Sequence, residues 1–187
     1  MSAPIVPQII EYLQTTQPNF LTFMLLEYYC LMRPLEIFRS CIKDYDLHAQ
    51  TITLEGWQTK NGKGRVITIP NNLISHLIHH FEAVKAYTYA PNTFLFSTGY
   101  RPGCHQLDSH ASGKTWTNLR KALHLPLEYK LYSFRDSSIF DMLMANIPAK
   151  VVQAHADHSS LAITSIYANH QNEELRREIR NDMPDII

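Results

Sequence analysis

The pattern of apolar and polar positions predicts a mainly helical chain. Apolar residues recur at helical spacing in most segments, and prolines stand where several of these segments begin, which suits the first turn of a helix. The most apolar segment, "NFLTFMLLEYYCLM" behind Pro18, is expected at the centre of the core. The predicted helices cover residues 7–15, 19–32, 34–41, 71–87, 112–124, 133–146, 149–155 and 161–168, with a last one at 171–181.

The period of the pattern changes between residues 51 and 70. The segments "TITLEGWQTK" and "GRVITIP" alternate apolar and polar residues, as strands with one buried face do. They flank "NGKG", and an Asn-Gly pair between two alternating segments is a strong signal for a hairpin. The sequence therefore predicts a mainly α fold with one small antiparallel β-sheet.

Length and composition narrow the class of protein. The 187 residues suit a single domain, and no apolar run approaches the ~20 residues that span a bilayer. The three cysteines are odd in number and show no CxxC spacing. This pattern predicts reduced thiols and a cytoplasmic location, with no membrane partner.

The charges balance overall but are unevenly distributed. The 17 basic and 17 acidic residues give a net charge of zero, whereas nucleic-acid binders usually carry a basic excess. Basic residues nevertheless gather at 60–65 and around positions 101, 114 and 120. Because local clustering matters more than the sum, the composition leaves DNA binding open without favouring it.

Several residues are candidates for a catalytic or binding role, and each also has a purely structural explanation. Arg135 begins its helix above an apolar stripe, so we expect its guanidinium to emerge beside a cleft and to suit a phosphate. A salt bridge is the alternative. Lys60 and Lys63 stand at or beside the hairpin tip, where they either enter a groove or face solvent. Tyr167, taken alone, is a core tyrosine.

No metal or nucleotide cofactor is predicted. His76, His79 and His80 lie on one helix face, but no cysteine or acidic ligand stands at zinc-like spacing and HExxH is absent. We therefore expect these histidines on a solvated face. The sequence also lacks a glycine-rich phosphate loop.

Two segments in the first half of the chain combine charged residues at fixed spacing. The segment "LMRPLE" places Arg33 three residues before Glu36, so Arg33 is either paired with that carboxylate or directed into a site. The segment "TKNGKGRVITIP" carries Lys60 at the start of the predicted hairpin connection.

The second half carries a further set. Arg135 stands 23 residues before His158, and Tyr167 follows nine residues later in "DHSSLAITSIYANH". In order and spacing, these segments resemble the catalytic domain of the tyrosine recombinases, the phage integrase family. The match runs from about residue 18 to 170. The resemblance implies the catalytic-domain fold of that family and site-specific DNA recombination or integration.

The resemblance also implies a role for each matched residue. Tyr167 attacks a DNA phosphodiester and forms a 3′-phosphotyrosyl link. Arg33 and Arg135 hold the non-bridging oxygens, and His158 donates a further hydrogen bond. Lys60 protonates the leaving 5′-oxygen as general acid, so the reaction needs no cofactor.

Other residues have supporting roles in this interpretation. Glu36 orients an arginine. Lys63, Arg65 and Lys114 are expected to contact DNA.

The chain departs from the family pattern at two positions. Tyr132 stands where the family has a histidine, in the general-base position; a phenol can hydrogen-bond a phosphate but is a poor base at neutral pH. Asp157 stands where the family has glycine, and this change alters the turn that presents His158.

The expected partner is double-stranded DNA, bound by a tetramer that is a monomer when free. Residues 1–187 are read as one catalytic domain with a core at 18–170. The tail at 171–187 docks either on its own domain or on a neighbouring subunit. The family's N-terminal core-binding domain is expected to be absent, because about 15 residues before the first matched helix cannot hold it. We expect an excised catalytic domain rather than a natural fragment.

Three other functions remain open. A catalytically silent relative would bind DNA without forming a covalent adduct. A type IB topoisomerase would share the chemistry but relax supercoils without a partner site. A plain helical interaction domain would show no affinity for DNA even at low salt.

Overall fold

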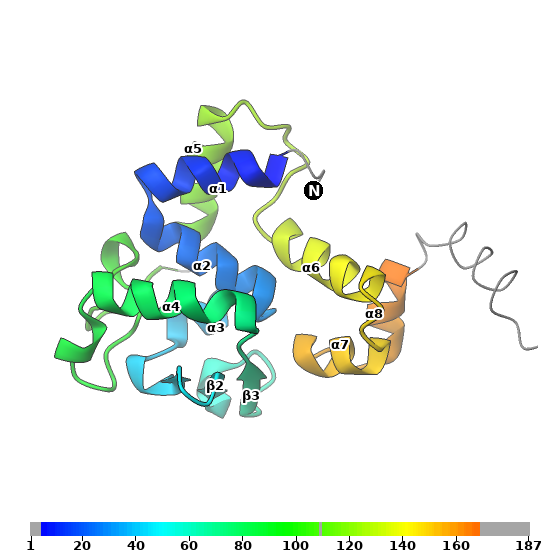
Figure 1. Ribbon diagram of the computed structural model, residues 1–187, viewed down its shortest axis with the longest axis horizontal. Coiled ribbons are helices and arrows are strands. Elements are labelled where there is room, and N and C mark those ends of the chain that lie inside the picture. The colour runs from blue at the N-terminus through cyan, green and yellow to red at the C-terminus, as the bar shows by residue number, and fades with distance from the viewer. Residues whose placement is uncertain (1–4, 109, 169–187) are drawn as a thin grey trace, which may run out of the picture. The chain divides into compact units, whose positions relative to one another are not determined.

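The computed structural model describes residues 5–108 and 110–168, and the chain divides into two compact units, Met1–Ser138 and Ile139–Ile187 (Figure 1). The first unit contains α1 (Ile5–Thr16), α2 (Pro18–Tyr29), α3 (Pro34–Arg39), α4 (Asn71–Ala83) and α5 (Ala111–Ala122). The division falls within α6 (Ser133–Met144), and the second unit continues with α7 (Ala149–Ala156) and α8 (Leu161–Ala168). Short 3-10 turns are η1 (Ile42–Asp44), η2 (Gly56–Gln58), η3 (Ala86–Thr88) and η4 (Thr98–Tyr100).

Helix α2 lies at the centre of the first unit, as its apolar sequence predicts. It packs against α1, α3 and α4. Its residues Phe20, Phe23 and Leu26 are fully buried, and each such burial contributes roughly 1.5–3 kcal/mol. The helix ends at Tyr29 rather than at the predicted residue 32, because Leu31 adopts a left-handed conformation (φ 47°) that a helix cannot continue.

The sheet is small and antiparallel, with strand order β1-β2-β3. Its strands are β1 (Tyr45–Asp46), β2 (Thr51–Leu54) and β3 (Arg65–Thr68), and Leu54 pairs with Arg65 at the end of the hairpin. The expected fold class, mainly α with one small antiparallel sheet, is confirmed. Strand β1 was not predicted.

The hairpin connection is longer than its Asn-Gly pair predicts. Strand β2 stops at Leu54, because the Glu55 amide donates to the Gln58 side chain (2.6 Å) and the chain turns into η2. Residues 55–64 therefore form the connection. A Cβ on Gly56 would lie 2.4 Å from the Gly62 carbonyl oxygen, so this close approach requires a glycine.

The remaining helices agree with the predicted ones within a few residues. Helix α4 ends at Ala83 rather than 87, because Lys85 takes a left-handed conformation. The predicted tail helix at 171–181 lies outside the described residues. Within residues 5–108 and 110–168, no helix is long and apolar enough to cross a membrane.

The second unit is a helical pair. Pro148 precedes α7, and α7 packs against α8. Val152, Ala156 and Thr164 are buried. This packing fixes the segment between the two helices, which carries His158.

Candidate active site

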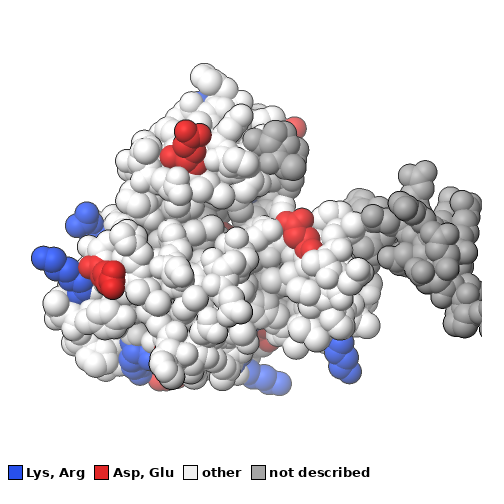
Figure 2. All heavy atoms as spheres, in the orientation of Figure 1, with Lys and Arg blue, Asp and Glu red and all other residues white. Residues whose placement is uncertain are grey.

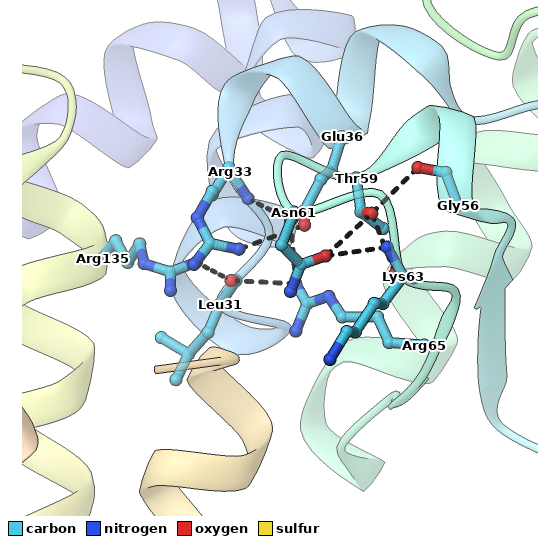
Figure 3. A network of polar contacts seen from close by, with 9 residues as sticks. All are labelled: Leu31, Arg33, Glu36, Gly56, Thr59, Asn61, Lys63, Arg65 and Arg135. Carbon is cyan, nitrogen blue, oxygen red and sulfur yellow. Dashed lines mark hydrogen bonds and ion pairs between the residues drawn. The ribbon is translucent and has the colours of Figure 1, made fainter. Parts of the chain in front are cut away.

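Three arginines from three separate elements lie around Glu36 and the Leu31 carbonyl (Figure 3). Arg33 directly precedes α3, Arg65 begins β3, and Arg135 lies in the first turn of α6. Arg33 Nη1 is 3.3 Å from Glu36 Oε1, and Arg65 Nη2 is 2.8 Å from Glu36 Oε2. We call Arg33, Glu36, Arg65 and Arg135 the arginine cluster.

Local structure fixes the Glu36 carboxylate. Pro34 opens α3, and Glu36 in its first turn accepts a hydrogen bond from the Arg33 amide (2.7 Å). A carboxylate in the first turn of a helix is also favoured by the helix dipole. The side chain of Glu36 is fully buried, so its orientation is set before any ligand arrives.

The Leu31 carbonyl is the second acceptor of the cluster. Arg135 Nη1 donates to it, and Arg65 Nη2 lies 3.4 Å from it. Leu31 is the left-handed residue after α2, so the same backbone turn that ends the helix directs this carbonyl toward two guanidiniums.

Arg135 is fully buried, and the prediction that it emerges at the edge of a cleft is wrong in this respect. Burial lowers the pKa of its guanidinium from the usual value, and the charges of Arg33 and Arg65 lower that pKa further. An arginine nevertheless keeps its proton in proteins.

The arginine cluster brings three guanidiniums together around one fully buried carboxylate and the Leu31 carbonyl. Charges interact more strongly in a medium of low dielectric than in water, so guanidiniums held in this way suit an anionic ligand. The planar fork of an arginine matches the oxygens of a phosphate.

Tyr132 lies beside the cluster. The Cζ atom of Arg135 is 5.9 Å from the centre of the Tyr132 ring, a distance within the range of cation–π contacts. Tyr132 is 43% exposed, so its side chain reaches solvent from the edge of this buried group.

The hairpin connection carries Lys60 and Lys63, which are both exposed. The Thr59 hydroxyl donates to the Lys63 carbonyl (2.8 Å), and the Lys63 amide donates to Asn61 Oδ1 (3.0 Å). These bonds shape the turn around Lys60, and Figure 3 shows the turn beside the arginine cluster. A lysine on such a turn can move while the backbone beneath it stays fixed.

The second unit contains His158 and Tyr167. His158 is half-buried, and its Nδ1 lies 3.0 Å from the hydroxyl oxygen of Thr164, which is fully buried. This contact orients the ring. Tyr167 lies in the last turn of α8. Ile163 and Ile166, with which a core tyrosine would share a packed face, are exposed.

Asp157 keeps the turn that glycine would make. It takes the left-handed conformation (φ 53°) at the end of α7. Its amide donates to the Ala154 carbonyl (3.2 Å) and the His158 amide to the Gln153 carbonyl (3.1 Å), the two bonds of a Schellman motif. Aspartate tolerates this conformation better than most residues, so the departure from glycine preserves the turn before His158.

A second buried polar cluster lies near the start of α2. The Thr22 hydroxyl oxygen is 2.9 Å from His76 Nε2 and 3.1 Å from His80 Nδ1. We call Thr22, His76 and His80 the histidine cluster. The predicted solvated face is wrong for His80, which is 4% exposed and stacks on Phe96, because α4 turns this residue toward α2.

Grooves extend the site along α5. One is lined by Pro34 and Tyr132 on one side and by Lys114 and Asn118 on the other. Another, at the start of α2, also contains Lys114, together with Arg101. On the face shown in Figure 2, basic and acidic side chains are scattered rather than gathered into one patch. Within residues 5–108 and 110–168, no group of three histidine, cysteine or acidic side chains could hold a metal ion.

Sequence reasoning missed three parts of this site. Arg65 was expected to contact DNA, yet its side chain also binds Glu36. The register of the β-hairpin, which pairs Arg65 with Leu54 at the end of the sheet, is the signal that could have located it. The role of the Leu31 carbonyl could not be predicted, because a backbone group leaves no signal in the pattern of side chains. Glu27 is an acid within the apolar α2, and that contrast was visible in the sequence.

Solved structures define the class of this fold. The crystal structure of XerA recombinase matches with a TM-score of 0.78 and 18% identity, over 99% of this chain and 65% of that chain. The Tn1549 transposon integrase in complex with transposon right end DNA matches with a TM-score of 0.73 and 15% identity, over 96% and 64%. A lambda integrase dimer bound to a COC′ core site matches with a TM-score of 0.68 and 18% identity, over 100% and 62%.

The fold is therefore that of a tyrosine recombinase catalytic domain, and the chain spans less than two thirds of each of these relatives. The model of the phage integrase family matches residues 2–174. The chain belongs to the phage integrase family. No curated protein sequence matches it.

Proposed function

We propose that this chain is the catalytic domain of a recombinase that cleaves and rejoins double-stranded DNA through Tyr167. The observation that carries the proposal is the arginine cluster, in which three guanidiniums from separate elements are held by the Glu36 carboxylate and the Leu31 carbonyl. Membership of the phage integrase family supplies the reaction class, which is site-specific recombination.

In the proposed reaction the Tyr167 hydroxyl gives its proton to solvent water, and its oxygen attacks a phosphodiester phosphorus. The bond from phosphorus to the 5′-oxygen breaks as the phosphotyrosyl bond forms, and Lys60 gives its proton to the leaving 5′-oxygen. Attack by a 5′-hydroxyl reverses these steps and frees the tyrosine. The covalent intermediate retains the energy of the phosphodiester, so rejoining needs no nucleotide.

The arginine cluster stabilises the charge that develops on the phosphate. Arg33 and Arg135 bind the non-bridging oxygens, His158 donates a further hydrogen bond, and Glu36 keeps Arg33 in place. Donors that are fixed before the reaction cost no reorganisation during it, which is why such groups supply a large part of catalysis. Tyr132 hydrogen-bonds the phosphate at the family's general-base position.

The DNA backbone runs from the cluster along the neighbouring grooves. Lys114 lines both grooves, and among the residues that the structure describes no acidic side chain lines either of them. Lys63 projects from the hairpin connection beside the cluster, and Arg65 contributes charge from within it. On paired sites the protein acts as a tetramer and is monomeric when free.

Covalent trapping tests the proposal. The protein is incubated with a library of nicked duplexes whose sequences around the nick are randomised, and adducts that resist detergent are recovered. The wild type and the matched control Tyr89→Phe, at an exposed tyrosine, are expected to give adducts, and Tyr167→Phe is expected to give none while still binding DNA. Adducts from the Tyr167→Phe protein would refute the nucleophile.

A silent DNA-binding relative is a second candidate, favoured by Tyr132 at the family's histidine position. It gives no adduct from any sequence in the library but still binds duplex DNA. Lys114→Gln then measures the contact in the grooves: the slope of log affinity against log salt is expected to fall by about one unit. Lys85→Gln, at an exposed lysine outside both grooves, is the control.

A further inference from the structure

Thr164 is a buried polar residue to which the proposed reaction assigns no role. It lies in the middle of α8 and is 0% exposed. Its hydroxyl oxygen is 3.0 Å from Nδ1 of His158. Within residues 5–108 and 110–168, Nδ1 is the one hydrogen-bond partner of this hydroxyl. The side chain of Thr164 is therefore bound to a residue of the proposed active site.

The backbone of His158 is held separately, by Gln153 of α7. The His158 amide donates to the Gln153 carbonyl (3.1 Å), and the Gln153 side-chain amide donates to the His158 carbonyl (3.2 Å). Both peptide groups of His158 are thus bound to one residue, while its ring is bound to Thr164. The direction of the imidazole is therefore set by α7 and α8 before DNA arrives.

The contact between His158 and Thr164 can be made in two ways. Either the hydroxyl donates to an unprotonated Nδ1, or a protonated Nδ1 donates to the hydroxyl oxygen. In the second arrangement the hydroxyl proton has no acceptor among the described residues, and a buried donor without an acceptor is costly. In the first arrangement one bond satisfies both groups. The burial of Thr164 therefore favours donation by the hydroxyl.

The next hydroxyl along α8 makes a different bond. Ser165 donates to the Leu161 carbonyl (3.0 Å), four residues earlier, which is a common bond of serine and threonine inside a helix. In the described part of the chain the Thr164 hydroxyl makes no bond to a carbonyl, so its proton goes to the imidazole instead. Ser165 is therefore a matched control for Thr164.

We propose that Thr164 is a positioning residue that fixes His158 in the tautomer with its proton on Nε2; this rests on the proposed function. A neutral imidazole has one ring proton, so a bond donated to Nδ1 places that proton on Nε2. Nε2 then donates to a non-bridging phosphate oxygen and cannot accept the proton of the Tyr167 hydroxyl. His158 is accordingly a hydrogen-bond donor and does not replace the family's general base, whose position Tyr132 occupies.

The tautomer of His158 is measured by NMR on the intact chain with isotopically labelled histidine. Spectra are recorded without DNA at about pH 9, where an ordinary imidazole is neutral. Protonated and unprotonated ring nitrogens differ widely in chemical shift, and the His158 signals are assigned by their absence in His158→Gln. The wild type is expected to favour the Nε2–H form by at least about tenfold. A proton on Nδ1 in the wild type would overturn the proposal.

Replacement of Thr164 shows whether its hydroxyl sets this preference. Thr164→Val removes the donor to Nδ1, so the share of the Nδ1–H form should rise at least about fivefold. Thr164→Ser keeps the hydroxyl and should restore the wild-type ratio, and the control Ser165→Ala should leave that ratio unchanged. An unchanged ratio in Thr164→Val, or no restoration by serine, would overturn the proposal. Thr164→Ala replaces the valine variant if that variant does not fold.

Covalent trapping connects the tautomer to the reaction. With a saturating duplex that the wild type selects from the library, Thr164→Val is expected to trap about tenfold more slowly, and Thr164→Ser and Ser165→Ala at nearly the wild-type rate. DNA affinity should change by less than about twofold, because the hydroxyl acts through His158 in the reaction step. A wild-type rate in Thr164→Val would overturn the positioning role. Failure of the wild type to trap DNA would refute the proposed function and leave the tautomer, which is measured without DNA, unchanged.

Discussion

Two buried polar clusters are associated with α2, and they differ in whether their side chains can lose their charge. The histidine cluster near the start of the helix joins the Thr22 hydroxyl to two imidazoles. The arginine cluster just beyond its end joins three guanidiniums to the Glu36 carboxylate and the Leu31 carbonyl. Both clusters tie α2 to elements distant in sequence, and both therefore contribute to the fold.

The difference indicates which cluster suits an anionic ligand. Burial lowers the pKa of His80 to about 4, so this ring is neutral at pH 7 and its cluster needs no counter-charge. Arginines cannot respond in this way, because their ordinary pKa is above 12. The arginine cluster therefore keeps its positive charges, and we expect an anion to bind there. Groups that stay charged inside a protein are thus a stronger indication of function than burial or polarity alone.

Replacement of an arginine has the largest expected effect on activity. Arg135→Lys keeps the charge but loses the planar fork, so we expect covalent trapping to fall roughly 10²- to 10³-fold. Arg39→Lys is the matched control; this arginine in α3 donates to the Trp57 carbonyl (2.7 Å) and should leave trapping unchanged. Equal trapping by wild type and Arg135→Lys would remove Arg135 from the site.

Loss of the shared carboxylate tests how the cluster holds its arginines. Glu36→Gln removes the carboxylate that both Arg33 and Arg65 contact, and removing one partner of a buried ion pair costs about 3–5 kcal/mol of unfolding free energy. Denaturant unfolding measures this loss, and added sulfate should restore more stability to the variant than to wild type. Glu55→Gln, in the exposed pair with Lys43, is the control. Rescue of equal size in both proteins would show that no anion replaces Glu36.

The histidine cluster predicts a pH dependence of stability. The pKa of His80 lies below its unfolded value of 6.5, at about 4, so its contribution is complete above pH 6.5 and is lost as the pH falls toward 4. The difference corresponds to about 3 kcal/mol. Unfolding free energies of wild type and His80→Gln are compared across this window, with His79→Gln, at an exposed histidine, as control. Parallel pH curves for wild type and His80→Gln would contradict the assignment.

The smallest effect is expected at Tyr132, which touches the arginine cluster only from its edge. Tyr132→Phe keeps the ring over Arg135 and removes the hydroxyl. One hydrogen bond to a charged group corresponds to a loss of about tenfold in the rate of trapping. A loss as large as that of Arg135→Lys would instead give Tyr132 a proton-transfer role.

The sequence predicts the fold class because its helices are long, apolar on one face and opened by prolines. Boundaries were less accurate where one residue adopts an unusual conformation, as Leu31 and Lys85 do with positive φ. The hairpin pairing was predicted, but not the ten-residue connection, since the turn at Gly56 depends on close contact with Gly62.

The candidate site was predicted from spacing rather than from local chemistry. The contact between Arg33 and Glu36 was one of two outcomes that the sequence left open, because three residues separate them on one helical turn. The Arg65–Glu36 pair and the buried position of Arg135 were not predicted, because both depend on tertiary packing. The same holds for His80, whose burial follows from the contact between α4 and α2.

Identification of the modified residue tests the central claim most directly. The trapped adduct is digested with nuclease and trypsin, and the peptide that carries the nucleotide is sequenced by mass spectrometry. The account predicts a 3′-phosphate on Tyr167, in the peptide of residues 151–176, where Tyr167 is the sole tyrosine. A nucleotide on any other residue would contradict it.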